Sequence, residues 1–243
     1  MSFASRRDPL TDRLCVASSD HWTQPTLTVR FFPFSAATPK SSVLKKRVEA
    51  VREMRLGSKK KATQRSADTP YLFQENHQPD CAYVGIPRVV SETRKFYTAA
   101  HLDPDVIAGD KVYVAVDPEG ILFGLISSSM FITWQRAIGG RLESRLSFAN
   151  TLTWNTFPVP ELDEKTRQRI IKAGKKVLDA RALHPERSLA EHYNPLAMSP
   201  ELVKAHDALD REVDKAFGAP RKLTTERQRQ ELLFTNYAAL TQN

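Results

Sequence analysis

The residues Phe157-Pro158-Val159-Pro160 divide the sequence into two parts with different patterns. Proline lacks a backbone N–H and disfavours helix in the residue before it, so two closely spaced prolines interrupt regular structure. After this break, apolar residues recur at helical spacing over 161–184, 200–217 and 225–240. Amphipathic helices with short connections are typical of a small bundle, so we expect residues 161–243 to form a C-terminal helical domain.

Short strand-like runs precede the break. CAYVGIPRVV (81–90) and KVYVAV (111–116) are rich in β-branched and aromatic residues. Asp-Pro-Glu-Gly (117–120) is a turn signal, and we expect the apolar run ILFGLI (121–126) that follows it to be a further strand.

Residues 127–138 change to helical spacing, with serines that can cap the helix and Gly139-Gly140 to end it. Strands and a helix together make residues 66–160 a mixed domain. The predicted fold class is therefore an α/β (α+β) domain followed by an all-α helical bundle.

The N-terminal part has two segments. Residues 1–40 show no sustained period, and we expect them to be poorly ordered or atypical. Residues 41–65 predict a basic helix or linker, because Leu44, Val48, Val51 and Leu56 recur at roughly helical spacing before Gly57. The basic residues expected on the other faces of this helix are Lys45, Lys46, Arg47, Arg52 and Arg55.

Most of the positive charge lies in this basic segment. It holds nine basic and two acidic residues, in a chain whose formal net charge is +8. One interpretation is a solvated helix face. The other is an arm that follows DNA phosphates, because grouped Lys and Arg side chains release counterions from a duplex. The candidate phosphate contacts in the arm are Lys45, Lys46, Arg52, Lys59 and Lys60.

The segment 141–149, RLESRLSFA, alternates like a strand. Leu142, Leu146 and Phe148 would share one face, and Arg141, Glu143, Arg145 and Ser147 the other. A continuous strand would place Glu143 and Arg145 about 7 Å apart on the same side. They are either an exposed ion pair or readers of one G·C pair, since Arg donates to guanine O6 and N7 and Glu accepts from the cytosine amino group.

Signatures of catalysis are missing from the sequence. There is no Gly-x-Ser-x-Gly nucleophile motif, no glycine-rich nucleotide loop and no paired metal-ligand spacing. His206 lies on an apolar stripe and is expected to be a core residue, while Asp163 to Lys165 are expected to open a helix. Two cysteines and no apolar run of about 18 residues fit a cytoplasmic protein without a membrane span.

Three groups of residues carry a resemblance to a known family. They are Pro-Arg-Val with Ser-Glu-x-Arg (87–94), Trp-x-Arg-x-x-x-Gly-Arg-Leu (134–142) and Asn-x-Phe-Pro-x-Pro (155–160). With the tail from VLDARALHPERS onward, they resemble the target recognition and C-terminal helical domains of MmeI-like type IIL restriction-modification enzymes. The resemblance covers about residues 43 to 240.

This resemblance implies roles for individual residues. The family's recognition domain reads an asymmetric DNA site, and the segment around Gly-Arg-Leu-Glu-Ser-Arg aligns with its base-reading stretch. Candidate base readers are therefore Glu143 and Arg145, with Ser147, Lys111 and Asp110 as weaker candidates by position. Candidate backbone or supporting contacts are Arg88, Arg94, Lys95, Arg136 and Arg141.

The family's catalytic signatures are not found in this chain. The Asn-Pro-Pro-aromatic motif of the adenine-N6 methyltransferase, its glycine-rich S-adenosylmethionine loop and the nuclease carboxylate–lysine motif are all absent. We therefore expect a sequence-specific binder of double-stranded DNA, inactive by itself, with S-adenosylmethionine bound by a separate methyltransferase domain. The alternatives are a subunit of a split methyltransferase, a protein-interaction helical module or a non-functional remnant.

Overall fold

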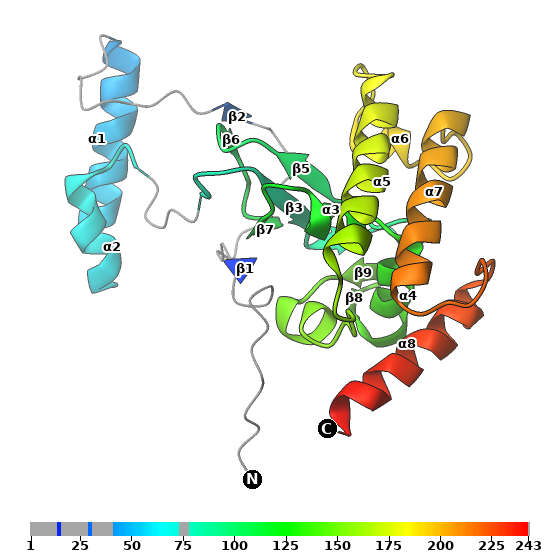
Figure 1. The fold of residues 1–243 in the computed structure, drawn as a ribbon. Helices are drawn as coiled ribbons and strands as arrows, with labels where there is room; N and C mark the ends of the chain where they lie inside the picture. The colour runs from blue at the N-terminus through cyan, green and yellow to red at the C-terminus, as the bar shows by residue number, and fades with distance from the viewer. Residues whose placement is uncertain (1–13, 16–28, 31–40, 73–77, 243) are drawn as a thin grey trace.

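The computed structural model describes residues 14–15, 29–30, 41–72 and 78–242 (Figure 1). Its larger sheet is antiparallel and has the strand order β1 (Leu14–Cys15), β7 (Val112–Val116), β3 (Tyr83–Pro87) and β5 (Ala100–Leu102). A second sheet joins β2 (Val29–Arg30) to β6 (Val106–Ile107). The predicted strands at 81–90 and 111–116 are confirmed. Apart from β1 and β2, the expectation for residues 1–40 lies outside the described residues.

The segment ILFGLI is a helix, α3 (Ile121–Ile126), and not the predicted strand. Asp117 explains the difference, because its carboxylate accepts hydrogen bonds from the backbone N–H groups of Leu122 (3.1 Å) and Phe123 (2.8 Å). These are N–H groups that a helix start leaves without partners. Gly120 adopts a φ of 85°, which directs the chain from β7 into the helix.

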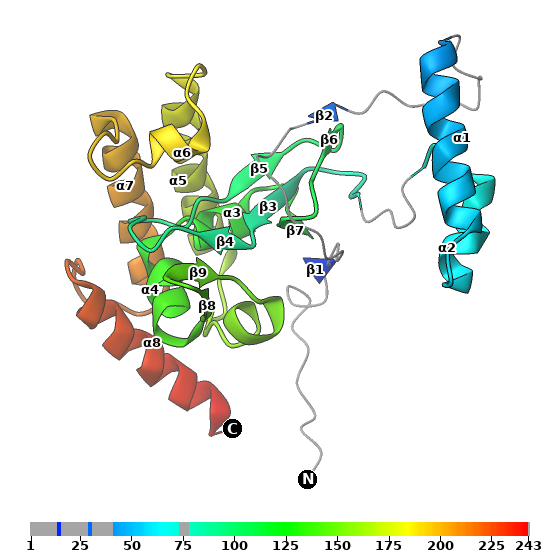
Figure 2. The ribbon, with the colours of Figure 1, turned by 180° about the vertical axis from the view of Figure 1, so that it is seen from behind.

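The predicted helix that follows is confirmed as α4 (Ser129–Ile138). The side chain of Ser128 accepts the backbone N–H of Phe131, and Gly139 ends the helix. The chain then enters a small sheet with the strand order β4 (Val89–Val90), β9 (Arg145–Ser147) and β8 (Gly140–Leu142). Figure 2 shows β8 and β9 directly beside α4.

Helices complete the C-terminal part, as predicted. They are α5 (Glu164–Ala182), α6 (Leu189–His192), α7 (Pro200–Ala216) and α8 (Glu226–Thr241). A capping box of Ser188 and Glu191 opens α6, and Ser199 and Thr225 cap the next two helices. Asp163 caps α5 by accepting the N–H of Thr166 at 2.6 Å, which confirms that the acidic residues there open a helix.

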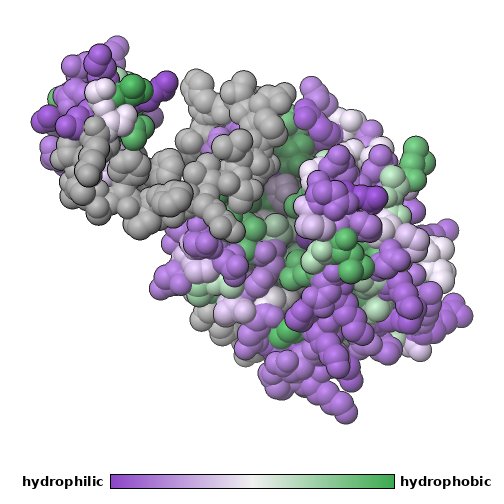
Figure 3. All heavy atoms as spheres, turned by 90° about the horizontal axis from the view of Figure 1, so that it is seen from above, coloured by the Kyte–Doolittle hydropathy of each residue, from purple (hydrophilic) through white to green (hydrophobic). Residues whose placement is uncertain are grey.

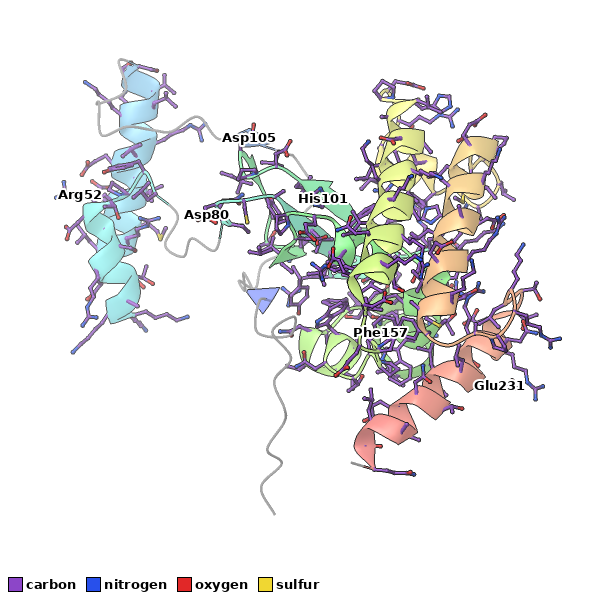
Figure 4. All side chains as sticks on the ribbon, viewed as in Figure 1. Arg52, Asp80, His101, Asp105, Phe157 and Glu231 are labelled. Carbon is purple, nitrogen blue, oxygen red and sulfur yellow. The ribbon has the colours of Figure 1, made fainter. Side chains whose placement is uncertain are left out.

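One continuous cluster of buried apolar residues connects the sheets to these helices. Phe157, in the proline-flanked break, lies at this junction: its ring centroid is 5.4 Å from that of Phe131 in α4 and 5.2 Å from that of Phe217 (Figure 4). The fold is thus a mixed region of strands and helices whose core continues into the helical part, which agrees with the predicted fold class.

The basic segment forms α1 (Ser42–Leu56) and α2 (Lys61–Arg65), which stand apart from the sheets in Figures 1 and 2. Leu44 and Leu56, two of the apolar residues that recur at helical spacing, are exposed. Arg55, expected on a solvated face, is buried. Its guanidinium donates to the carbonyl oxygens of Ser66 (2.7 Å), Thr69 (2.9 Å) and Leu72 (2.7 Å), and so fixes the chain that follows α2 against α1.

Candidate nucleic-acid interface

The candidate base readers lie on the hairpin of β8 and β9. Leu142 pairs with Arg145 across it, so only Glu143 and Ser144 form the turn. The prediction of one continuous strand over 141–149 is therefore wrong, and Glu143 lies at the tip instead of on a strand face. Its φ of 57° is in the left-handed region, which costs a non-glycine residue about 1 kcal/mol.

Charged groups gather at this hairpin tip. A carboxylate oxygen of Glu143 lies 2.7 Å from Nη2 of Arg145, and Arg141 donates to the carbonyl oxygen of Ser144 at 3.2 Å. The Glu143 side chain is 77% exposed and that of Arg145 41% exposed. An ion pair this exposed contributes under about 1 kcal/mol to stability. Breaking it so that each side chain binds a polar ligand instead therefore costs little free energy.

Helix α4 contacts the end of the hairpin that lies opposite the tip. Leu146 is buried between the outward-facing Arg145 and Ser147. The Ser147 carbonyl oxygen accepts a hydrogen bond from Nε2 of the buried Gln135 at 3.0 Å. The alternation expected for the second half of the segment is thus present, and it places Arg145 and Ser147 on one side of β9.

The weaker candidates Asp110 and Lys111 lie in the turn just before β7, a strand of the neighbouring sheet. Their side chains form an ion pair of 3.2 Å. Arg88 links the two sheets through its backbone: its N–H donates to the Lys111 carbonyl at 2.9 Å, and its own carbonyl accepts from Phe148 at 2.8 Å. The Arg88 guanidinium lies 5.4 Å from the ring centroid of Tyr113.

Two candidate supporting arginines hold structural contacts. Arg136 donates to a carboxylate oxygen of Glu226 at 2.8 Å and to the carbonyl oxygen of Arg94 at 2.7 Å, which ties α4 to α8. Arg94 donates to the carbonyl oxygen of Ala190 at 2.9 Å, and partial burial lowers its pKa. Lys95 beside them is exposed.

Apart from Arg55, the basic residues of the arm are exposed. Arg52 has a distant partner in Glu49, 3.8 Å away, and lies on the side of α1 that faces away from the sheets (Figure 4). Figure 3 shows the unit of α1 and α2 as mainly hydrophilic with a small apolar patch. The exposed candidate phosphate contacts on this unit are Lys45, Lys46, Arg52, Lys59 and Lys60.

A buried polar network behind the interface was not predicted. Arg181 donates to the Tyr193 hydroxyl at 2.9 Å and to the Ala99 carbonyl at 2.8 Å, and the same hydroxyl lies 2.7 Å from Nε2 of His206. His206 stacks on Phe96, and burial lowers its pKa well below the usual range. The expected core role of His206 is confirmed. The partners come from separate elements, so no sequence spacing could have revealed the network.

A cavity of about 380 Å³ lies between α7 and the loop before α8. Charged side chains line most of it, among them Lys95, Arg211, Lys222 and Asp207. No glycine is among the residues that line it. Within the described part of the chain, no three His, Cys, Asp or Glu side chains are placed to hold a metal ion. None of the described helices is long and apolar enough to cross a membrane.

Comparison with known proteins identifies the two regions. Residues 35–161 match the family described as "MmeI, target recognition domain", and residues 162–243 match "MmeI, C-terminal domain". DNA methyltransferase A of Bacillus subtilis (strain 168) is 32% identical over 200 residues. That match covers 82% of this chain and 22% of the relative.

A solved structure has the same fold. It is the type IIL restriction-modification enzyme MmeI in complex with DNA, which superimposes with a TM-score of 0.73 at 39% identity, over 83% of this chain and 27% of that one. The chain therefore spans about a quarter of the length of each of these proteins. Both halves of the sequence match one family, and the fold agrees. The chain belongs to the MmeI family of type IIL restriction-modification enzymes, corresponding to its target recognition and C-terminal domains.

Proposed function

We propose that this chain is a sequence-reading module for double-stranded DNA, and that the tip of the β8–β9 hairpin reads one base pair. The observation that supports this most directly is the exposed pair of Glu143, in the two-residue turn, and Arg145, the first residue of β9, next to the buried Leu146. A side chain that reads bases has to project beyond the protein surface and be held from behind, and this hairpin meets both conditions.

The pair supplies complementary hydrogen-bonding groups. Arg145 offers donors that match guanine O6 and N7, and Glu143 offers an acceptor that matches the cytosine amino group. In the free protein each of the two satisfies the other at 2.7 Å. Binding to a G·C pair would replace this contact with two base contacts. The other base pairs present their donors and acceptors in a different order across the major groove, so the same side-chain geometry would match them less well. Discrimination of about 1–3 kcal/mol is expected from such a contact.

The remaining candidates supply orientation and affinity. Arg141 at the tip, and Ser147, Asp110 and Lys111 farther back, are proposed to contact bases or phosphates near the one that the pair reads. The arm of α1 and α2 is proposed to follow the phosphate backbone, which adds affinity that does not depend on sequence. Arg94 and Arg136 are proposed to support the interface from within. Both guanidinium groups already donate hydrogen bonds to other groups of the protein.

A selection experiment tests the base-reading role. Random-sequence duplexes are enriched on the purified chain and on a Glu143→Lys, Arg145→Asp variant, at about 100 mM salt so that phosphate contacts do not dominate. A consensus for the wild type that changes at one position in the variant is the expected result. If the wild type enriches no consensus, or if the variant enriches the same one, the proposal is wrong.

The chain offers a matched control for this experiment. Arg227 and Glu231 form an exposed ion pair of 3.0 Å on α8. The swap Arg227→Asp, Glu231→Lys exchanges the same kinds of charge and preserves the net charge. We expect it to leave the consensus unchanged. A shift in this control as well would show that charge swaps act through folding or general electrostatics.

A second candidate function is that of a specificity subunit in a split methyltransferase. It is favoured by the 32% identity of this chain to DNA methyltransferase A of Bacillus subtilis (strain 168). In that case S-adenosylmethionine and the catalytic groups reside in a separate protein. Incubation with labelled S-adenosylmethionine and duplex DNA should transfer no methyl group until such a partner is added. Methyl transfer by the purified chain alone would contradict this.

A further inference from the structure

Gln135, the residue below the reading hairpin, connects both of its ends. It lies in α4 with none of its surface exposed. Its backbone carbonyl accepts the N–H of Gly139 at 2.9 Å, immediately before β8 begins. Its side chain reaches the far end of the hairpin, where Nε2 donates to the Ser147 carbonyl at 3.0 Å. One residue thus holds the point where the hairpin leaves α4 and the point where it returns.

Gly139 makes room for this amide. A Cβ atom at position 139 would lie 1.9 Å from Nε2 of Gln135 and 2.5 Å from its carbonyl oxygen. Both distances are far below van der Waals contact, so no side chain fits there while Gln135 keeps its place. The hydrogen bond to Ser147 also determines which way the amide points, because a backbone carbonyl can only accept.

The other half of the amide has no such contact. Oε1 of Gln135 is buried and has no hydrogen-bond partner among the described residues. A buried acceptor without a partner costs free energy, which offsets what the single donated bond contributes. An apolar side chain of similar length would therefore serve stability nearly as well as glutamine. The geometry of the hairpin is what would change.

Ser147 is two residues from Arg145 along β9, and it pairs with Gly140 in β8 and with Val89 in β4. A shift of its carbonyl would tilt β9 and the turn that it leads back to. We infer that Gln135, in the space left by Gly139, is a positioning residue that sets the direction of the hairpin tip and thereby the selectivity of Glu143 and Arg145. This inference rests on the base-reading function proposed above.

Gln135→Met tests the inference in the full chain. Methionine keeps the length of the side chain and its fit in the core but removes the donor to Ser147. Affinity is measured for the consensus duplex, for a duplex changed at the pair read by the hairpin, and for duplexes changed at other positions. We expect discrimination at that one pair to fall by about tenfold, with other positions and non-specific duplex changed less than about twofold.

A core variant far from the hairpin supplies the control. Val177→Ala removes apolar volume from a fully buried position in α5. We expect it to lower the melting temperature more than Gln135→Met does and to leave discrimination unchanged at every position. If Gln135→Met reduces discrimination equally everywhere or not at all, or if Val177→Ala reproduces its effect, Gln135 is only a structural residue.

The outcomes separate this inference from the function on which it rests. If the Glu143→Lys, Arg145→Asp variant does not change the consensus, the hairpin does not read DNA, and both proposals fail. If that variant changes the consensus while Gln135→Met discriminates like the wild type, only the positioning role fails.

Discussion

At the scale of single residues, burial and hydrogen bonding have opposite effects on the pKa of the Asp210 carboxylate. It lies in α7 and accepts hydrogen bonds from the backbone N–H (2.7 Å) and the hydroxyl (2.5 Å) of Ser129, at the start of α4. Arg229 lies 3.7 Å away but bonds mainly to Asp214, whose carboxylate it contacts at 2.8 Å. Burial is the largest effect and raises the pKa of Asp210 to about 6.

This raised pKa predicts a pH dependence of stability. An aspartate has a pKa of about 3.9 in the unfolded chain, so the folded state binds the proton more tightly. The stabilising contribution of protonated Asp210 to the free energy of unfolding is then present in full below about pH 4 and is lost as the pH rises through about 6. The loss amounts to about 2–3 kcal/mol. Asp210→Asn keeps both contacts to Ser129 without the titration. Unfolding free energies measured from pH 4 to 7 should therefore fall for the wild type relative to this variant.

The comparison isolates Asp210 from other titrating groups. His206 has a lowered pKa and contributes in the opposite direction, but it is present in both proteins and drops out of the difference. Asp207→Asn removes an exposed carboxylate from the same helix and serves as the control. Wild-type and Asp210→Asn curves that run parallel from pH 4 to 7 would show that Asp210 does not titrate in this range.

Residue identity alone does not reveal the hairpin turn. The alternation in 141–149 is real on the β9 side, but Leu-Glu-Ser-Arg contains no Gly, Asn or Asp to announce a left-handed turn residue. Glu143 adopts that conformation because the pairing of β8 with β9 fixes the turn. β9 is in turn held by its pairing with β4 and by the hydrogen bond from Gln135 in α4, and none of these contacts is visible in the segment itself. The burial of Arg55 escapes prediction for a similar reason: its three carbonyl partners lie 11 to 17 residues farther along the chain.

At the scale of elements, α3 and α5 cross at two glycines. A Cβ on Gly174 would lie 3.3 Å from the Cα of Gly124, and one on Gly124 would lie 2.8 Å from a methyl carbon of Ile170. This crossing connects the recognition region to the helical part. Gly174→Val should lower the free energy of unfolding by about 1–3 kcal/mol, because the backbone of α3 has no room to retreat.

Chemical denaturation measures this effect. Lys176→Ala, an exposed change on the same helix, should stay within about 0.5 kcal/mol of the wild type. Equal stability of the Gly174→Val and Lys176→Ala variants would mean that the crossing is looser than the structure indicates.

The sequence predicts elements best where local chemistry decides them. The helices after Pro160 begin at Ser, Thr or Asp caps that are visible in the sequence, and all three long ones are predicted correctly. The prediction for the run 121–126 is wrong, because six apolar residues fit a buried strand and a buried helix equally well. Only the bonds from Asp117 to the start of α3 distinguish the two.

At the scale of the whole molecule, the proposed function places base selectivity in the β8–β9 hairpin and sequence-independent affinity for DNA in the arm of α1 and α2. The hairpin belongs to the region whose core continues into the helices, while the arm of α1 and α2 stands apart from the sheets (Figure 1). The region proposed to read bases has mixed charge, and the arm concentrates positive charge. Non-specific attraction to DNA should therefore depend on the arm, and base selectivity on the hairpin.

The salt dependence of binding tests this division of labour. Removing one lysine that binds a phosphate should reduce the slope of log affinity against log salt by about 0.9, because fewer counterions are released. We expect a lower slope and an unchanged consensus when four exposed arm lysines are replaced by glutamine: Lys45, Lys46, Lys59 and Lys60. The control makes the same change in net charge on the helical part: Lys165, Lys172, Lys176 and Lys204.

If both variants lower the slope equally, DNA binding depends on the total charge of the chain and the arm has no special role. If the arm variant instead loses its consensus, the arm helps to place the hairpin on its site, and affinity and selectivity are not separable in this fold.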